Sequence, residues 1–218
     1  MLHTQLAGAT SRRDGGSVTC TISCIVEGHG EVSSVPILLR RIAESLNPAV
    51  VVSVPPPLRV PADKLCRPGE LERHVELAAR KVGAGGGVLV LLDADDEEDC
   101  PARLGPELLA RCIAQRSDVP VAVVLAKREF EAWFLAAATS VAGRRGLAHD
   151  LQGPENPEEV RGAKEWLRRH MASGTTYAPT QDQPALTAVF DVSEARAASP
   201  SFDKCHREVV RLLGGGDA

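Results

Sequence analysis

The chain has 218 residues, of which 44% are hydrophobic, 25% charged and 3% aromatic. This is the composition of a globular domain of ordinary size whose core consists mainly of aliphatic side chains. The net charge of −4 argues against a protein that binds nucleic acid through a generally positive surface. No apolar stretch approaches the roughly 18 residues that a membrane span needs.

The first 17 residues contain no continuous apolar segment, so a signal peptide is not expected, and we predict a disordered leader over residues 1–17. The six cysteines are scattered along the chain without a Cys-x-x-Cys pair. We expect them to be reduced thiols rather than disulfides or zinc ligands. Together these features predict a cytoplasmic protein that has no contact with membranes.

Four short apolar segments alternate with helical patterns in the first two thirds of the chain. The predicted strands cover residues 19–26, 49–54, 88–92 and 119–126. The predicted helices cover residues 33–46, 70–82, 106–116 and 127–141, and a proline-rich loop covers 55–68. Alternation of nearly continuous apolar strands with helices is typical of a parallel sheet that has helices on both faces. We therefore predict an α/β domain over residues 18–142, with a parallel four-stranded sheet.

The remaining residues, 143–218, have a different pattern that predicts further helices, at 158–171, 183–197 and 201–213. We expect a helical annex that packs on the sheet domain. Its positive side chains could form a basic face for a nucleic-acid backbone, although a solvated helix surface is the default explanation (Arg144, Arg145, Lys164, Arg168 and Arg169).

Acidic residues follow the third predicted strand directly. Asp93 and Asp95 are two residues apart, so on an extended chain their carboxylates face the same side. Two carboxylates close together are unfavourable unless positive charge lies between them. A hard divalent cation is the simplest candidate, and an acidic turn without a bound ion is the alternative.

Other charged residues follow the neighbouring strands. The first strand ends at Glu27 and Gly28, where the glycine allows a tight turn, and Glu31 follows four residues after Glu27. Right-handed crossovers place the ends of parallel strands on one edge of the sheet, so we expect Glu27, Asp93 and Lys127 to converge. The predicted ligands of Mg²⁺ or Mn²⁺ are Glu27, Glu31, Asp93, Asp95 and Glu129.

The predicted catalytic residues are Glu27, Lys127 and Arg128. A lysine or an arginine at the end of the fourth strand could stabilise negative charge that develops on a phosphoryl oxygen. The alternative for both cations is a surface position with nearby acids as partners. Glu129 could be a metal ligand or a base next to the ligands.

The strand that ends in Val26-Glu27-Gly28, the acid at Glu31 and the later Asp93-x-Asp95 resemble the Toprim domain. That domain occurs in topoisomerases, DnaG-type primases and overcoming-lysogenization-defect (OLD) nucleases. The segments VEGHGE, LLDADD, KREFEAWF and SPSFDK, together with the stretch from Tyr177 to Asp182 and Gln183, more closely resemble a bacterial domain-of-unknown-function family of Toprim-like proteins, often encoded beside ATPases. By this resemblance Glu27, Glu31, Asp93 and Asp95 would be metal-site acids, and Lys127 would loosely match a catalytic lysine.

These patterns predict a nuclease, or another phosphodiester-cleaving enzyme, that depends on Mg²⁺ or Mn²⁺ and acts on DNA or RNA in phage defence or DNA repair. The alternative is a Toprim-like binding module with little activity of its own, which acts as the partner of an ATPase and docks through the helical annex. A HAD-type phosphatase is a weaker third hypothesis, because Glu97 stands where its motif expects Thr or Ser.

Overall fold

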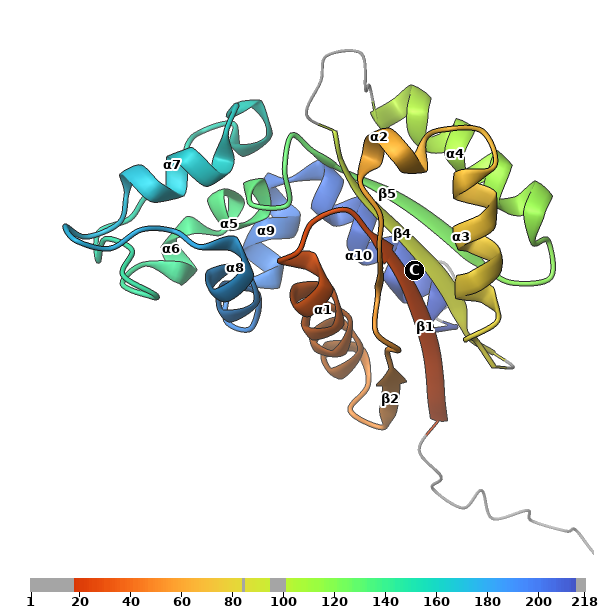
Figure 1. Ribbon diagram of the computed structural model, residues 1–218. Coiled ribbons are helices and arrows are strands. Elements are labelled where there is room, and N and C mark those ends of the chain that lie inside the picture. Colours follow the sequence, from red (N-terminus) through yellow and green to blue (C-terminus); the bar gives the residue numbers. More distant parts are fainter. Residues whose placement is uncertain (1–17, 84, 95–100, 215–218) are drawn as a thin grey trace, which may run out of the picture.

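The computed structural model describes residues 18–83, 85–94 and 101–214. A parallel sheet carries helices on both faces and is followed by a helical C-terminal region (Figure 1). This confirms the predicted α/β class. The predicted leader and Asp95 lie outside the described residues. None of the helices in the described ranges has the length and apolar character needed to cross a membrane.

The sheet has four strands in one path and a fifth, short strand beside them. In space the order is β2-β1-β4-β5, formed by Val50–Ser53, Val18–Val26, Gly87–Ala94 and Val121–Lys127, and all neighbours are parallel. The short strand β3 (Leu58–Arg59) pairs with the end of β1. It was not predicted, because it lies in the proline-rich segment.

The order of the strands creates a reversal between β1 and β4. From β1 the chain passes to β2 on one side, and it then returns to the other side of β1 to form β4 and β5. In open α/β sheets, ligands bind in the crevice outside the carboxyl ends of the strands at such a reversal. The residues that follow β1 and end β4 flank this crevice.

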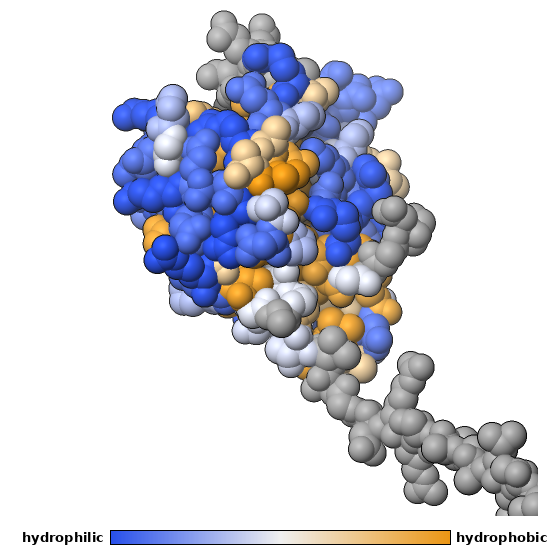
Figure 2. All heavy atoms as spheres, turned by 90° about the vertical axis from the view of Figure 1, so that its right-hand side faces the viewer, coloured by the Kyte–Doolittle hydropathy of each residue, from blue (hydrophilic) through white to orange (hydrophobic). Residues whose placement is uncertain are grey.

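Helices α1 (Glu31–Leu46) and α10 (Pro200–Leu212) cover one face of the sheet, and α3 (Glu70–Ala79) and α4 (Pro101–Gln115) cover the other (Figure 1). A single turn, α2 (Ala62–Leu65), precedes α3. The side of the molecule that carries α3 and α4 is mainly hydrophilic, with apolar side chains exposed between charged ones (Figure 2).

Burial on both faces explains why the strands are nearly continuous apolar runs. In β4, Leu89 and Leu91 belong to the core on the α1 and α10 side, whereas Val88, Val90 and Leu92 belong to the core on the α3 and α4 side. Successive residues of a strand point to opposite faces, so both sets must be apolar.

The C-terminal half contains shorter helices than predicted. They are α5 (Ala132–Ala136), α6 (Ala138–Val141), the 3₁₀ helix η1 (Pro157–Glu159), α7 (Ala163–Arg169), α8 (Pro179–Thr187) and α9 (Val192–Ala198). The predicted helix 127–141 starts late because Arg128 has a left-handed backbone with φ of +71°. The predicted helix 158–171 starts only after Gly162, whose φ is +69°. The predicted helix 183–197 is two helices, and α4 begins at Pro101 rather than Pro106.

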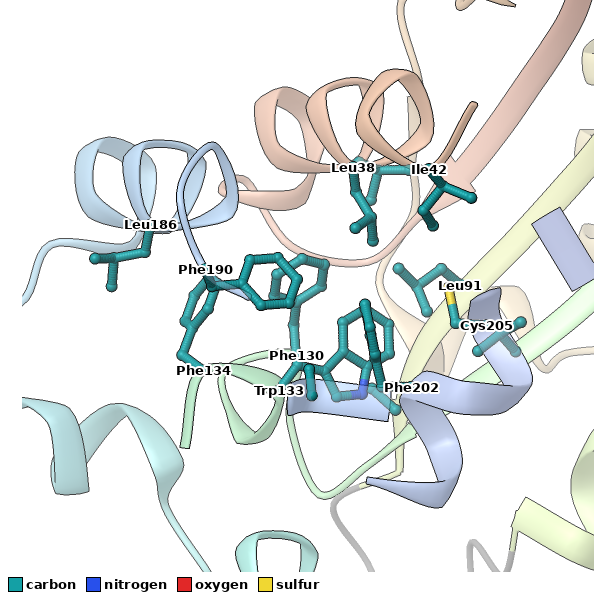
Figure 3. Packing of buried hydrophobic residues seen from close by; sticks show 14 of the residues in the cluster. Leu38, Ile42, Leu91, Phe130, Trp133, Phe134, Leu186, Phe190, Phe202 and Cys205 are labelled. Carbon is teal, nitrogen blue, oxygen red and sulfur yellow. The ribbon is translucent and has the colours of Figure 1, made fainter. Parts of the chain in front are cut away.

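An aromatic cluster joins the C-terminal helices to the sheet domain (Figure 3). The Trp133 ring lies 4.6 Å from that of Phe130 and 5.1 Å from that of Phe202, between ring centroids. Phe190 contacts both Phe134 and Phe202. The helical C-terminal region therefore shares one hydrophobic core with α1 and the sheet.

Candidate functional site

The ends of three parallel strands are connected through Asp93. Its backbone N–H donates to Glu27 Oε2 at 3.3 Å, and its own Oδ1 accepts a hydrogen bond of 2.9 Å from the backbone N–H of Phe130. Glu27 follows β1, Asp93 is the penultimate residue of β4, and Phe130 follows β5. The predicted convergence of Glu27 and Asp93 is therefore present at the strand reversal.

The turn after β1 is held by the carboxylate of Glu31. Its Oε2 accepts hydrogen bonds from the backbone N–H groups of Glu27 (3.0 Å) and Gly28 (3.1 Å). A Cβ at position 28 would lie 2.8 Å from Glu31 Oε1, so only glycine fits without displacing the carboxylate. Burial raises the pKa of Glu31 to about 7, although the two backbone donors act to lower it.

Two more acids enter the site after β5, where the left-handed Arg128 turns the chain. Glu131 is fully buried, and its Oε1 accepts hydrogen bonds from the Tyr177 hydroxyl (3.0 Å) and from Gln183 Nε2 (3.2 Å). Burial raises the pKa of Glu131 above its usual value. Its Oε2 is also buried and makes no hydrogen bond within the described part of the chain.

Lys164, on α7, inserts its ammonium group among these carboxylates. Nζ lies 2.8 Å from Glu129 Oε1, 3.4 Å from Glu131 Oε2 and 3.7 Å from Asp93 Oδ2. The backbone N–H of Lys164 donates to the other oxygen of Glu129 at 3.0 Å. Burial acts to lower the pKa of Lys164, but the three carboxylates outweigh it and raise the pKa, so the ammonium stays charged.

We call Glu27, Glu31, Asp93, Glu129 and Glu131 the acid cluster. Burial raises the pKa of Asp93 well above its usual value, the charge of Glu31 adds to this effect, and Lys164 opposes it. Several buried carboxyl groups beside one ammonium are unfavourable for stability. Strongly perturbed pKa values in a crevice are typical of a functional site, since structure alone gives no reason to gather like charges.

Four of the predicted site residues lie in the acid cluster, namely Glu27, Glu31, Asp93 and Glu129. Lys127 does not: its side chain lines a separate pocket with Ser201 and Lys204. Arg128 contributes the turn after β5, and its backbone N–H donates to the carbonyl of Ala94.

Glu131, Tyr177 and Gln183 were not among the predicted site residues, and the role of Lys164 was not predicted either. The placement of Lys164 on a basic outer face was wrong, because its side chain is only 28% exposed and points into the acid cluster. One signal was available: Glu129 and Glu131 are two residues apart in KREFEAWF, as Asp93 and Asp95 are in LLDADD.

Gln183 connects the acid cluster to α1. Its Oε1 accepts a hydrogen bond of 3.0 Å from Ser34 Oγ, while its Nε2 donates to Glu131. Gly30 allows this contact, since a Cβ there would lie 2.3 Å from Gln183 Oε1. Helices α1 and α8 are thus held together by the group that orients Glu131.

The chemistry of the acid cluster suits a hard cation, because all of its members offer carboxylate oxygens. Among the described residues, however, no three His, Cys, Asp or Glu side chains are arranged to hold a metal ion. The ammonium of Lys164 lies between Asp93, Glu129 and Glu131 in this arrangement. Glu27 and Asp93 are the members at the strand reversal itself, and Asp95, the next predicted ligand, is outside the described residues.

Comparison with known proteins gives one match. The model of the family described as "Domain of unknown function (DUF4276)" matches residues 26–209. No curated protein and no solved structure matched the chain. The matched residues span most of the chain and include the whole acid cluster together with Lys164, Tyr177 and Gln183. The chain therefore belongs to the DUF4276 family.

Proposed function

We propose that this protein is a divalent-metal-dependent nuclease, which cleaves phosphodiester bonds of DNA or RNA with Mg²⁺ or Mn²⁺. One observation carries the proposal: acids from the ends of β1, β4 and β5 meet at the strand reversal, where open α/β sheets bind their ligands. Acid residues of this kind are the usual means by which proteins bring a metal to a phosphate group.

The electrostatics of the acid cluster support the same function. Buried carboxyl groups outnumber the one ammonium that contacts them, and the pKa values of Glu31, Asp93 and Glu131 are raised. A divalent cation would offset this excess of negative charge. Glu27 and Asp93 would hold it, with Asp95 as the third ligand that the sequence suggests. A bound metal ion supplies an activated water and stabilises the leaving oxygen.

The protein's own residues prepare the site. Glu31 fixes the turn after β1 through two backbone N–H groups, and this turn holds the Glu27 carboxylate against the backbone of Asp93. Lys164 binds Glu129 and keeps the mutual repulsion of the acids tolerable. Tyr177 and Gln183 hold Glu131 in one orientation. Such preorganisation is needed for a site that must place a phosphate group accurately.

The resemblance to Toprim domains and OLD nucleases adds to the proposal. The order Glu27, Glu31, Asp93, Asp95 follows the order of acids in those proteins, and the strands that carry them alternate with helices. Phage defence or DNA repair would be the setting of such an enzyme.

Cleavage assays with the purified chain test the proposal. We expect cleavage of labelled single-stranded DNA, double-stranded DNA or RNA in Mn²⁺ or Mg²⁺, and none in EDTA. Asp93→Asn should abolish cleavage, while Asp63→Asn, at an exposed acid in α2, should leave it unchanged. If the folded protein cleaves none of the three substrates and Asp93→Asn does not weaken Mn²⁺ binding, the proposal is wrong.

A second function is supported by a different observation. Lys164 already contacts three of the acids, and Glu129 and Glu131 are buried, as in a structural ion-pair network. On this hypothesis the chain is a Toprim-like binding module that works as the partner of an ATPase. Co-purification of an ATPase with the chain from its native host tests this. Cleavage by the chain alone would support the first function, and cleavage only by the complex would support the second.

A further inference from the structure

A pocket of about 410 Å³ lies at the end of β5, between the first turns of α4 and α10. Its apolar walls come from Pro101, Leu125 and Pro200, and its polar lining includes Lys127 and Lys204. We call it the lysine pocket. It is separate from the acid cluster, because none of its lining residues belongs to that cluster.

The two lysines make part of the pocket lining basic. Within the described residues, neither ammonium forms a hydrogen bond or an ion pair. Lys204 lies early in α10, and its Nζ is close to α4, since a Cβ added at Gly105 would lie 3.4 Å from it. Residues from the first turns of α4 and α10 line the same pocket, and the N-terminal end of a helix carries partial positive charge. The two lysines and the two helix ends therefore favour an anion in the pocket.

Among the described residues, the other polar side chains of the pocket leave its lining positive overall. Glu158 also lines it, but its Oε1 already accepts hydrogen bonds from Ser199 Oγ (2.5 Å) and from the backbone N–H of Ser201 (2.8 Å) at the start of α10. Its single charge therefore leaves one of the two ammonium charges uncompensated.

Ser201 also lines the pocket, but its hydroxyl group is already bonded within the protein. Its Oγ accepts hydrogen bonds from the backbone N–H of Lys127 (3.2 Å) and from Trp133 Nε1 (3.0 Å). Its proton points to Ser199 Oγ at 3.4 Å, because the proton of Ser199 is donated to Glu158. The two lysines are therefore the groups that can bind an anion, and together with the apolar walls they match a ligand with an anionic head and an apolar body.

We propose that the lysine pocket binds one nucleotide, with its phosphate at Lys127 and Lys204 and its sugar and base against Pro101, Leu125 and Pro200. The volume lies within the range of about 300–1,000 Å³ that small-molecule sites have, and lysine is a common phosphate ligand. The choice of a nucleotide over other anions rests on the proposed function. The nucleotide comes either from solution or from the end of a nucleic-acid strand, and both carry the same phosphate.

Isothermal titration calorimetry in EDTA, where no metal-dependent cleavage occurs, tests this inference with AMP, adenosine and a 5′-phosphorylated oligothymidylate. We expect a phosphate-bearing probe to bind, and adenosine to bind at least about 10-fold more weakly than AMP. Lys127→Gln and Lys204→Gln should each weaken binding by about 10-fold or more. The matched control is Lys81→Gln, an exposed lysine that follows α3.

The outcomes distinguish a free nucleotide from the end of a strand, and nucleotide binding in the lysine pocket from nuclease activity at the acid cluster. Tight binding of AMP indicates a free nucleotide, and tight binding of the oligonucleotide alone indicates a strand end. Failure of both probes to bind, or equal binding by the lysine variants and the Lys81→Gln control, would overturn the inference. Asp93→Asn should bind the probes normally, so a nuclease assay that fails while the lysine-dependent binding persists would refute only the catalytic proposal.

Discussion

Replacing Lys164 by Met removes the ammonium from the acid cluster and keeps most of the side-chain volume. Asp93, Glu129 and Glu131 then lose the cation that lies 2.8–3.7 Å from their oxygens. Removal of one partner from a buried ion pair typically costs about 3–5 kcal/mol, because the remaining charge stays buried. We expect the free energy of unfolding to fall by this amount at pH 8, which for a chain of this length lowers Tm by about 10 °C.

The loss of stability caused by Lys164→Met should become smaller as the pH falls. The pKa values of Asp93 and Glu131 are already raised by burial, and loss of the ammonium raises them further. As the pH falls, the folded variant therefore takes up protons before the unfolded chain does, and its stability rises relative to that of the wild type. The loss at pH 5 should be clearly smaller than at pH 8.

Urea unfolding at the two pH values measures both effects, with Lys81→Met as a control at an exposed lysine. If Lys164→Met lowers the free energy of unfolding by less than about 1 kcal/mol at pH 8, Lys164 contributes no more to stability than an exposed surface lysine does. A loss that is the same at both pH values would mean that the acids do not titrate as a group. Either result would refute the electrostatic reasoning about the acid cluster.

Two further predictions concern the turn after β1. The pKa of Glu31 is about 7 in the folded state, so the contribution of Glu31 to the free energy of unfolding should fall as the pH rises from about 4.5 to 7, by at most about 3 kcal/mol. Glu31→Gln should remove this pH dependence, which urea unfolding at several pH values measures. An unchanged slope would contradict the burial of a titrating Glu31. Gly30→Ala should destabilise the protein by about 1–3 kcal/mol, because the added Cβ would meet Gln183. Gly83→Ala is the control, since a Cβ there has no atom within 4 Å and should not destabilise the protein. Equal changes in the melting temperature of the two variants would contradict the close approach of α1 and α8.

The sheet could be predicted because its four main strands are buried on both faces. Continuous apolar runs such as 88–92 reveal such strands directly, and the carboxyl ends of parallel strands must share an edge. The same rule predicts that Glu27 and Asp93 lie close together. The late start of α7 depends on a single backbone conformation, that of the left-handed Gly162, which periodicity does not detect. The two-residue strand β3 lies in the proline-rich segment and is too short to show a pattern.

The position of Lys127 could have been predicted by counting residues along two strands. Asp93 points to the same face as Leu91, which packs on the α1 and α10 side, whereas Lys127 points to the same face as Leu125, on the α3 and α4 side. Asp93 pairs with Ala126 across the sheet, so Asp93 and Lys127 lie on opposite faces. Lys164 could not be found in this way, because it lies on a helix outside the sheet.

The origin of Lys164 has a consequence for folding. The sheet can pair its strands from residues 18–127, but the ammonium that compensates its acids comes from α7, and the groups that hold Glu131 come from the segment around α8. Until those late segments dock, the sheet edge carries like charges without compensation, and long loops must close before the docking occurs. The acid cluster therefore makes the two halves of the chain a single cooperative unit, and a fragment that ends before α7 would lack both the charge balance and much of the aromatic core that its sheet requires.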